Sequence, residues 1–439
     1  MNIILLSGGS GKRLWPLSNE VRSKQFLKIF KRPDGSHESM VQRMSRMIHE
    51  VDRGATITIA TSKTQVSAIH NQLGMDVGIS VEPCRRDTFP AIALASAYLH
   101  DVQNVSLDEA VVVCPVDPYV NEDYFVAIHR LCELAQSEVA NLTLMGIDPT
   151  YPSEKYGYII PVSKEKVSKV SEFKEKPNME AAQRYIDAGG LWNGGVFAYK
   201  LKYVLDRAHQ LIDFTDYYDL FSKYNTLEKI SFDYAIVEHE SNIAVLRFAG
   251  QWKDLGTWNT LTEAMEEDII GDVRVDDTCN NVHAINELGI PLLIMGEENL
   301  IVSASPDGIL VTTEEAADKI KPYVDAIDQQ IMYAEKSWGR YQVIDVGDKS
   351  LTIKITLIPN YHMNYHSHER RDEVWTVISG TGKTIVDGME QLIKAGDVVT
   401  MSAGCKHTVI AGDEGLQLIE VQLGSEISVS DKKKFEMPL

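Results

Sequence analysis

The sequence predicts an α/β domain with a mostly parallel sheet, followed by a small β unit and then an antiparallel β-barrel. Three observations lead to this prediction. In the first half of the 439-residue chain, short apolar runs alternate with segments of helical periodicity. From residue 271 the apolar runs become shorter and are separated by Gly and Asp, and after Ser337 nearly every run is typical of a strand. We therefore expect three parts, covering residues 1–265, 266–332 and 333–439.

The first part contains four runs that are apolar throughout, as strands buried on both faces of a sheet are. These runs cover residues 3–6, 57–60, 110–114 and 142–145. Helical patterns between the runs cover residues 39–49 and 90–99, and we expect a helix at 260–267 to end this part. Strands that alternate with helices favour parallel pairing, because a parallel connection needs a crossover.

The rest of the chain has a different pattern. Strands are expected at residues 291–295 and 300–303, and a connecting helix at 314–327. In the last part, turn residues at short intervals predict a small barrel with strands at 351–358, 374–378, 384–386, 398–402 and 416–421. The lysines at 432–434 are expected to lie in solvent.

Composition excludes several classes of protein. The 43 basic and 63 acidic residues give a net charge of −20, which argues against nucleic-acid or anionic-membrane partners. No apolar run approaches the length of a bilayer span, and the N-terminus lacks the pattern of a signal peptide. The five cysteines are scattered and odd in number, as in a reduced, cytoplasmic protein. We expect a cytoplasmic homo-oligomer with small-molecule partners.

A glycine-rich loop directly follows the first predicted strand. Gly8, Gly9 and Gly11 allow a tight turn whose backbone N–H groups can face phosphate oxygens. Lys12 and Arg13 add positive charge at the same place. The spacing matches neither the P-loop nor the dinucleotide-binding fingerprint, so an ordinary glycine-rich turn is the alternative.

The segments around this loop resemble the signature of mannose-1-phosphate guanylyltransferases, a family of sugar-nucleotide pyrophosphorylases. The resemblance rests on residues 8–18 (GGSGKRLWPLS) and 23–27 (SKQFL). Further segments match in the same order over some 260 residues: 82–93 (EPCRRDTFPAIA), 113–117 (VCPVD), 156–159 (YGYI), 173–177 (FKEKP), 192–197 (WNGGVF), 231–235 (SFDYA) and 252–258 (WKDLGTW). The resemblance implies a Rossmann-like, GT-A-like nucleotidyltransferase fold, with an NTP and a sugar-1-phosphate as substrates.

The resemblance also implies roles for individual residues. Arg13, Lys24, Asp117 and Asp254 are the expected catalytic residues, with the two aspartates holding Mg²⁺. The expected nucleotide-binding residues are Gly8, Gly9, Gly11, Lys12, Arg13, Glu82 and Arg86. The expected sugar-phosphate-binding residues are Gly157, Glu175, Lys176 and Asn193. Such phosphoryl chemistry depends on charge neutralisation and alignment more than on a protein nucleophile.

Three positions depart from the family pattern. Pro118 replaces the histidine that follows the metal-binding aspartate, Asp87 replaces an asparagine, and Lys12 replaces a small hydroxyl residue. A carboxylate at Asp87 can still accept hydrogen bonds from guanine. GTP with mannose-1-phosphate is the leading prediction, and another NTP or sugar-1-phosphate stays open.

The last part contains a pattern typical of a metal site. His366 and His368 lie two residues apart and therefore on one face of a strand, and Glu373 and His407 complete the set. Three imidazoles and a carboxylate suit Zn, Mn, Fe, Ni or Co. The spacing HxHx₄Ex₆G followed by Gx₅SxGxxH resembles the two motifs of the cupin fold. Surface histidines without a metal are the alternative.

This part also resembles the cupin of bifunctional bacterial family members, which isomerises mannose-6-phosphate to fructose-6-phosphate. Residues 337–341 (SWGRY), 371–375 (RDEVW), 377–381 (VISGT) and 418–422 (LIEVQ) carry the likeness. His366 stands where the family has glutamine, Val374 where it has histidine, and the C-terminal basic segment is replaced by DKKKFEMPL. Metal binding is expected, and isomerase activity stays open. A catalytically silent sugar-nucleotide sensor is an alternative of another class, which the retained catalytic residues disfavour.

Overall fold

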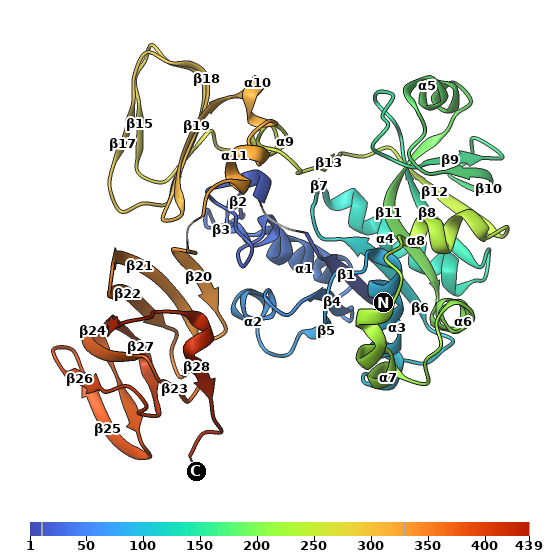
Figure 1. Cartoon of the computed structure of the whole chain (residues 1–439). Coiled ribbons are helices and arrows are strands. Elements are labelled where there is room, and N and C mark those ends of the chain that lie inside the picture. Colours follow the sequence, from blue (N-terminus) through green and yellow to red (C-terminus); the bar gives the residue numbers. More distant parts are fainter. Residues whose placement is uncertain (10–11, 329, 439) are drawn as a thin grey trace. The chain divides into compact units, whose positions relative to one another are not determined.

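The computed structural model describes residues 1–9, 12–328 and 330–438, so Gly11 of the predicted phosphate loop lies outside the described residues. The chain divides into two compact units (Figure 1). The first unit comprises Met1–Ser10, Ser23–Val66 and Gln72–Glu266. The second comprises Gly11–Arg22, Ser67–Asn71 and Glu267–Leu439. The three-part division expected from the sequence stays a prediction.

A nine-stranded mixed sheet forms the centre of the first unit, in the order β5-β4-β1-β6-β11-β8-β12-β10-β9. Strands β5, β4, β1 and β6 are parallel, as are β8 and β12, whereas β11 runs antiparallel to its neighbours β6 and β8. The bounds are β1 Asn2–Ser7, β4 Thr56–Ser62, β5 Gly78–Glu82, β6 Ala110–Pro115, β8 Leu142–Ile147, β9 Tyr158–Pro161, β10 Val167–Lys174, β11 Leu191–Lys200 and β12 Ile243–Phe248. The four predicted strands are β1, β4, β6 and β8, and the predicted α/β class is confirmed.

Helices pack against this sheet through apolar side chains, and α3 is apolar on nearly all sides, as a fully buried helix is. In α3, Phe89, Ile92 and Leu94 are buried in one core with strand residues such as Val111 and Leu144. The bounds are α1 Met40–Val51, α2 Val66–Leu73, α3 Thr88–Asp101, α4 Glu122–Gln136, α5 Met179–Asp187, α6 Leu201–Leu211, α7 Tyr217–Lys223, α8 Phe232–Ala235 and α9 Trp258–Thr262. Short 3₁₀ turns are η1 Lys12–Leu14, η2 Lys24–Phe26, η3 Tyr224–Thr226 and η4 Val237–His239.

The helix expected at 260–267 is wrong in its extent. Helix α9 begins after a capping box formed by Thr257 and Thr260 and ends at Thr262. The run Glu266-Glu267-Asp268 that follows would place negative charge at the C-terminal end of a longer helix, where the helix dipole disfavours it.

A small β unit follows at the start of the C-terminal stretch of the second unit. Strands β14, β16 and β18 pair in parallel and β19 pairs antiparallel with β18, while β15 and β17 form a second parallel pair. The bounds are β14 Ile269–Ile270, β15 Val273–Val275, β16 Asn280–Asn286, β17 Leu292–Ile294, β18 Glu298–Ser305 and β19 Gly308–Thr313. The single helix expected at 314–327 is wrong: α10 (Glu314–Ala317) and α11 (Lys321–Asp325) are separate. Pro322 lacks an N–H and starts a helix well, but it interrupts a continuous one.

The segment after the glycine loop packs within the second unit. Ser305 Oγ donates to the carbonyl of Pro16 (2.6 Å), and Arg22 makes two bonds to the Glu287 carboxylate (2.6 and 2.7 Å). Gly308 is required beside the Trp15 ring, because a Cβ there would lie 2.4 Å from it. Trp15 and Pro16 of the segment RLWPLS (residues 13–18) therefore contact the small β unit.

The last part is a curled antiparallel sheet, as predicted for the barrel. Its path runs β20-β21-β22-β27-β23-β28, and β24 pairs with β25, β26 and β27. The bounds are β20 Tyr333–Lys336, β21 Gly339–Gly347, β22 Ser350–Leu357, β23 His366–His368, β24 Arg371–Val386, β25 Met389–Lys394, β26 Val398–Met401, β27 His407–Gly424 and β28 Lys432–Lys434. Buried Trp375, Val409 and Leu418 belong to its core.

Two sequence-based expectations change here. The strands expected at 374–378 and 384–386 are one bent strand, β24, with register shifts near Gly380. Gly380 has φ +80°, and a Cβ there would lie 2.1 Å from the carbonyl oxygen of Gly415. The lysines at 432–434 form strand β28; Lys433 and Lys434 are exposed, as expected, whereas Lys432 is half-buried.

No helix of the described residues is long and apolar enough to cross a membrane. The five cysteines are all described and none is disulfide-bonded: Cys84, Cys114, Cys132, Cys279 and Cys405.

Candidate active site and metal centre

Two short strands bring the predicted metal-binding aspartates together. Strand β7 (Pro118–Val120) continues from Asp117 and pairs antiparallel with β13 (Trp252–Asp254), with Pro118 opposite Asp254. Lys24 Nζ lies 2.8 Å from Asp117 Oδ2 and 3.6 Å from Asp254 Oδ1. Lys24 also donates to the carbonyl of Leu255 (3.0 Å). One ammonium thus bridges two half-exposed carboxylates, at a place where oxygen ligands for a hard cation converge.

A pocket of about 220 Å³ opens beside these carboxylates. Both Asp117 and Asp254 line it, with Tyr156 and Trp252, whose ring centroids lie 5.5 Å apart. The predicted sugar-side residues Gly157, Glu175 and Asn193 line the same pocket.

Gly157 is required for the shape of this pocket. A Cβ at that position would lie 2.5 Å from Glu175 Oε2 and 3.1 Å from the Phe173 ring. Lys176 Nζ forms a 2.5 Å ion pair with Glu175. Burial lowers the pKa of Lys176, but the hydrogen bond to Glu175 and the charge of Glu175 raise it by more, so this pKa lies above its ordinary value. Glu175 and Lys176 are thus adjacent and of opposite charge at the pocket.

Asp233 also lines the pocket, although its place in the segment 231–235 (SFDYA) predicts no role for it. Asn193 Nδ2 donates to Asp233 Oδ1 (2.6 Å), and the backbone N–H of Gly195 donates to Asn193 Oδ1 (3.1 Å). Burial, and secondly the charge of Glu175, raise the pKa of Asp233 to about 7. A carboxyl with a shifted pKa among polar pocket residues is a signal of function, but it exists only in three dimensions.

A buried polar network supports the described part of the glycine loop. Gln65 Nε2 donates to the carbonyl of Gly9 (3.3 Å) and to Ser23 Oγ (2.8 Å), and Ser23 Oγ donates to the same carbonyl (3.1 Å). Gln25 Nε2 donates to Ser7 Oγ (3.0 Å). These side chains fix the end of β1, and Gln65 has no sequence signal because it lies far from the loop in the chain.

Glu82 lies beside the loop at the end of β5. A Cβ on Gly8 would lie 4.0 Å from Glu82 Oε1, and Tyr224 donates a hydrogen bond to Glu82 Oε2 (2.8 Å). Burial raises the pKa of Glu82. Arg86 donates to the carbonyl of Asn225.

Asp87 caps helix α3. Its backbone has φ +70°, and its Oδ1 accepts the N–H of Thr88 (2.8 Å). An asparagine oxygen would cap equally well, so the change to aspartate preserves the local fold.

Lys12 and Arg13 belong to the second unit. Lys12 Nζ lies 3.2 Å from Asp325 and 3.8 Å from Glu20, and Arg13 is exposed. Within the second unit, Lys12 is thus paired with a carboxylate of α11 and with Glu20.

The four predicted cupin ligands form one buried cluster. His366 and His368 come from β23, Glu373 from β24 and His407 from β27. Their ligand atoms all lie within 4.8 Å of one another. His366 and His407 are directly opposite in the β23–β27 pair.

The hydrogen bonds of the imidazoles fit metal coordination. Each Nδ1 faces a backbone carbonyl: His366 faces Asn364 (2.6 Å), His368 faces Asp431 (3.3 Å) and His407 faces Cys405 (3.0 Å). A carbonyl only accepts, so each Nδ1 carries the proton and each Nε2 keeps its lone pair. Burial is the largest cause that lowers the pKa of His366 to about 2 and that of His368 to about 4, so both rings are neutral at pH 7.

One oxygen of the Glu373 carboxylate accepts no hydrogen bond, although it is buried within the ligand cluster. Glu373 Oε2 lies 3.1 Å from His407 Nε2, yet both atoms are buried without a hydrogen-bond partner, since each is an acceptor. A divalent ion would satisfy both. The donor set therefore fits a transition metal.

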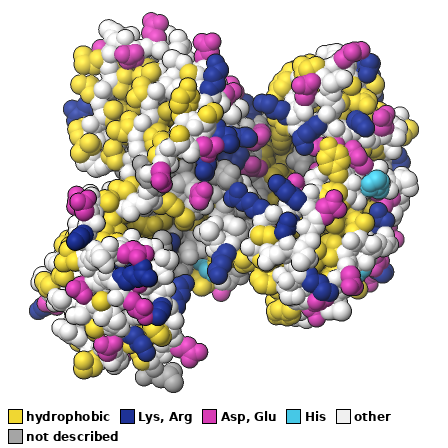
Figure 2. Space-filling view, in the orientation of Figure 1, with side chains coloured by type: hydrophobic (Ala, Val, Ile, Leu, Met, Phe, Trp, Pro, Cys, Tyr) yellow, Lys and Arg dark blue, Asp and Glu magenta, His cyan; other side chains and the backbone are white. Residues whose placement is uncertain are grey.

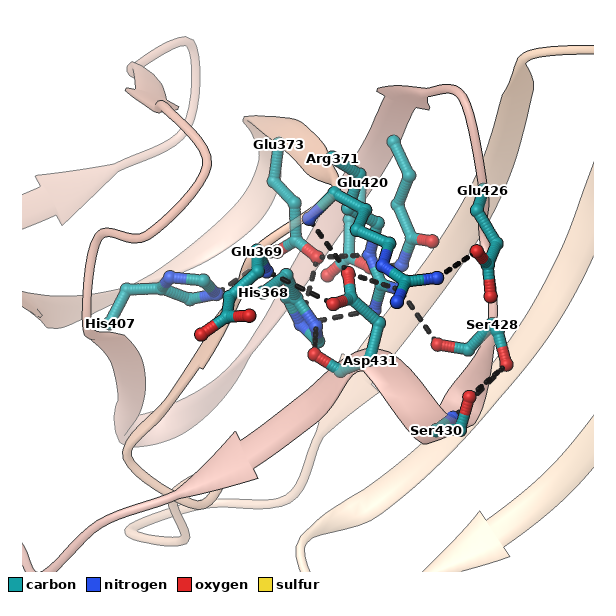
Figure 3. Close-up of polar contacts among 12 residues, drawn as sticks. His368, Glu369, Arg371, Glu373, His407, Glu420, Glu426, Ser428, Ser430 and Asp431 are labelled. Atoms are coloured by element: carbon teal, nitrogen blue, oxygen red, sulfur yellow. Dashed lines mark hydrogen bonds and ion pairs between the residues drawn. The ribbon is translucent and has the colours of Figure 1, made fainter.

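Arg371 connects this cluster to the C-terminal segment (Figure 3). Its Nε donates to Glu373 (3.2 Å), its Nη2 lies 3.1 Å from His368 Nε2, and its Nη1 donates to the carbonyl of Ser428 (2.9 Å). The Asp431 carboxylate accepts the N–H groups of Glu369 and Arg370 (3.1 Å each). Ser428 and Asp431 are thus hydrogen-bonded to Arg371 and to the loop between β23 and β24.

A second buried carboxyl lies behind the cluster. Glu420 accepts from Trp375 Nε1 (3.0 Å) and Gln422 Nε2 (2.5 Å). Burial, and secondly the charge of Glu373, raise the pKa of Glu420 to about 7.

Comparison with known proteins matches both parts. The nucleotidyl transferase family model covers residues 2–269, and the mannose-6-phosphate isomerase C-terminal model covers residues 326–437. The xanthan biosynthesis protein XanB of Xanthomonas campestris is 31% identical, over 99% of this chain and 97% of XanB. The mannose-1-phosphate guanylyltransferase of Escherichia coli is 28% identical, over 98% and 97%.

A relative and a solved structure extend this agreement. The alginate biosynthesis protein AlgA of Pseudomonas putida is 28% identical over 99% of this chain and 95% of AlgA. A crystal structure described as a mannose-1-phosphate geranyltransferase from Thermus thermophilus has 25% identity and a TM-score of 0.58, over 74% of this chain and 98% of that one.

The fold and the carboxylate-lined pocket define the class: this chain is a nucleotidyltransferase enzyme with a cupin domain that contains a buried metal-type ligand cluster. It belongs to the mannose-1-phosphate guanylyltransferase family, in the form fused to a mannose-6-phosphate-isomerase-like domain.

Proposed function

We propose that the nucleotidyltransferase part of this chain joins GTP and mannose-1-phosphate to give GDP-mannose and pyrophosphate. The observation that carries this proposal is the pair Asp117 and Asp254, bridged by Lys24 at the mouth of a pocket lined by Glu175 and Asn193. Two carboxylates for a cation, an ammonium for phosphates and hydrogen-bonding groups for hydroxyls match the needs of this transfer.

Asp117 and Asp254 would hold Mg²⁺, whose charge would neutralise the phosphate oxygens when bound. Lys24 would exchange its carboxylate contacts for oxygens of the reacting phosphates, and Arg13 would stabilise charge on the β- and γ-phosphates. The sugar-1-phosphate oxygen attacks the α-phosphorus in line with the departing pyrophosphate, so alignment of the two substrates is the main task of the pocket.

Glu175, Asn193 and Gly157 would orient the sugar. Glu175 accepts hydrogen bonds from hydroxyl groups, Asn193 donates and accepts, and Gly157 leaves room for the ring. Lys176 would leave its pair with Glu175 to hold the incoming phosphate, which offers more negative charge.

Gly8, Gly9 and Gly11 would bind the triphosphate through backbone N–H groups, with Lys12 adding charge. Glu82 and Arg86 would contribute on the nucleoside side. Asp87 uses one carboxylate oxygen as a helix cap, and the other is available to accept N1–H or N2–H of guanine.

The test is pyrophosphate release from each of four NTPs with mannose-, glucose- or fucose-1-phosphate in the presence of Mg²⁺. Turnover confined to GTP and mannose-1-phosphate is the expected result. Another preferred pair would keep the chemistry and replace the substrates, and no turnover with any pair would favour a binding protein without catalysis.

A second candidate function is favoured by the buried ligand cluster in the cupin. We infer that His366, His368, Glu373 and His407 hold a divalent metal, with Zn, Mn, Fe, Ni and Co as the candidates. An aldose–ketose isomerase needs such a polarising ion and a base, so conversion of mannose-6-phosphate to fructose-6-phosphate is the activity to assay. Metal analysis of the purified chain identifies the ion.

A homo-oligomer remains our proposal for the assembly. Strand β19 is the edge of its sheet, and Ile309 and Val311 on it are 60% and 63% exposed, as Leu293 on β17 is at 64%. Figure 2 shows hydrophobic side chains gathered over this small β unit. An apolar edge favours pairing with a second copy. Ultracentrifugation of the I309K/V311K variant, expected to be monomeric, checks this, and the cytoplasmic location stays a prediction.

A further inference from the structure

The last strand of the chain places lysines beside the candidate metal ligands. Strand β28 runs antiparallel to β23, with Lys432 opposite His368 and Lys434 opposite His366. Directly opposite residues of an antiparallel pair project to the same face. Lys432 and Lys434 therefore share a face with the two histidines, whereas Lys433 projects to the other face.

The electrostatic interactions agree with this placement. Burial lowers the pKa of Lys432, and the charges of Glu420 and Glu373 act on it in the opposite direction. Lys336 on β20 belongs to the same group, because burial and then the charge of Lys434 lower its pKa. The charge of Lys434 thus acts on both Lys432 and Lys336.

These three lysines lack carboxylate partners. In the part of the chain that the structure describes, no carboxylate lies within 4.0 Å of the Nζ atom of Lys336, Lys432 or Lys434. Lys336 lies over the Tyr341 ring, 5.5 Å from its centroid. Lys433, by contrast, is ion-paired with Glu369. In a chain with 63 acidic and 43 basic residues, three lysines without an ion-pair partner in one region are an unusual concentration of positive charge, which Glu420 and Glu373 offset only at Lys432.

We propose that Lys336, Lys432 and Lys434 bind the phosphate group of a phosphomonoester whose sugar oxygens reach the metal at the histidine cluster. The proposal rests on the metal centre proposed above and supplies the phosphate anchor that an isomerase of sugar phosphates needs. Ammonium groups bind phosphate as point charges, and a dianion offsets much of the positive charge that the metal and the lysines add beside Glu373 and Glu420.

The geometry also explains a departure noted in the sequence. The chain ends in DKKKFEMPL instead of the family's basic segment. Strand β28 restores basic side chains at the cupin through its alternation, since every second residue of a strand faces the ligands.

The test compares the K432Q/K434Q variant of the full-length protein with K433Q. The control removes a lysine from the same strand but from the opposite face. Calorimetric titrations use mannose-6-phosphate, mannose and inorganic phosphate, and metal content is measured in each sample. Sites elsewhere in the chain contribute equally to all variants, so only the difference between them reports on the cupin.

We expect K432Q/K434Q to bind mannose-6-phosphate at least tenfold more weakly, with unchanged metal content, and K433Q to bind it like the unchanged protein. Mannose should bind more weakly than its phosphate. Equal losses in both variants, or none in either, would overturn the anchor. Binding of inorganic phosphate as tight as that of the sugar phosphate would overturn the contact between sugar and metal.

Two further comparisons distinguish loss of the phosphate anchor from misfolding and from absence of the metal. If the double variant does not fold, K434Q alone changes an exposed side chain and should still weaken binding several-fold. A protein that binds no metal but still discriminates between the variants would refute the metal centre and retain the anchor.

Discussion

The ammonium of Lys24 lies between two carboxylates that come from strands far apart in the sequence. We expect Asp117 and Asp254 to be important for catalysis and to contribute little to the stability of the fold. Both side chains are half-exposed, and exposed ion pairs contribute only about 0–1 kcal/mol to stability. Removal of one carboxylate charge should therefore affect turnover much more than folding.

We expect Asp117→Asn and Asp254→Asn each to lower Mg²⁺-dependent turnover by roughly 100-fold or more, as loss of a charge-stabilising group does. The melting temperature should change little. Steady-state rates over a Mg²⁺ titration measure the effect. Asp148→Asn is the matched control, because Asp148 pairs with Arg247 (2.7 Å) and does not line the pocket. Normal rates in both pocket variants would refute the metal assignment.

Asp233 makes stability depend on pH in a defined direction. Its pKa of about 7 in the folded protein exceeds the ordinary value, so the folded state keeps a proton that the unfolded state has lost above about pH 4. The contribution of Asp233 to stability is therefore greatest below about pH 4, declines between about pH 4 and 7, and is constant above.

The variant Asp233→Asn should remove this component. We expect the fall in melting temperature of the first unit between pH 5 and pH 8 to be smaller in Asp233→Asn than in the unchanged protein. Asp148→Asn again serves as the control and should retain the full difference. Thermal unfolding at the two pH values measures it, and identical slopes would show that Asp233 does not titrate in this range.

Helix α1 illustrates how local sequence sets an element. Ser39 and Gln42 form a capping box, in which Ser39 Oγ accepts the N–H of Gln42 (3.3 Å) and Gln42 Oε1 accepts that of Ser39 (3.1 Å). Such a cap contributes about 1 kcal/mol, because it satisfies N–H groups that the helix leaves unpaired.

We expect Ser39→Ala to lower the free energy of unfolding of the first unit by about 1–2 kcal/mol. Ser45→Ala, in the middle of the same helix, should be neutral or slightly stabilising, since alanine has the higher helix propensity. Urea unfolding followed by circular dichroism distinguishes the two. Equal effects would mean that the capping box does not determine the stability of α1.

The sequence predicts correctly those elements whose own residues form a recognisable pattern of apolar residues or of ligand spacing. Strands β1, β4, β6 and β8 follow from continuous apolar runs, and the ligands on β23 follow from a two-residue spacing. Long-range effects explain the misses. Strands 374–378 and 384–386 merge into β24 because Gly380 permits a bend, and β28 forms only because β23 offers it a partner. Asp233 and Gln65 act through neighbours distant in sequence, so no local pattern marks them.

At the scale of the whole molecule, the candidate catalytic pocket belongs to the first unit and the histidine cluster to the second. Within the described residues, each set of side chains is supported by hydrogen bonds inside its own unit. The contacts that position Lys24 between Asp117 and Asp254 therefore involve none of the four residues of the histidine cluster.

We expect the His366→Ala/His407→Ala variant to lose its bound transition metal and to keep pyrophosphate release at the rate of the unchanged protein. Metal analysis and the NTP assay on the same preparation measure both. His362→Ala is a suitable control, because His362 lies near the cluster in sequence but outside it. A collapse of NTP turnover in the double variant would show that the two units are coupled.

Residues 12–22 pack against β18, β19 and Glu287, so division of the chain at residue 266 would separate this segment from its packing partners. A chain cut after residue 266 keeps Trp15 and Arg22 but loses the surface against which they pack. Neither half could then be expressed as a finished module, and a protease that nicks the linker should leave the fragments associated. The nucleotidyltransferase part and the C-terminal part are therefore connected through residues 12–22 as well as through the peptide bond after residue 266.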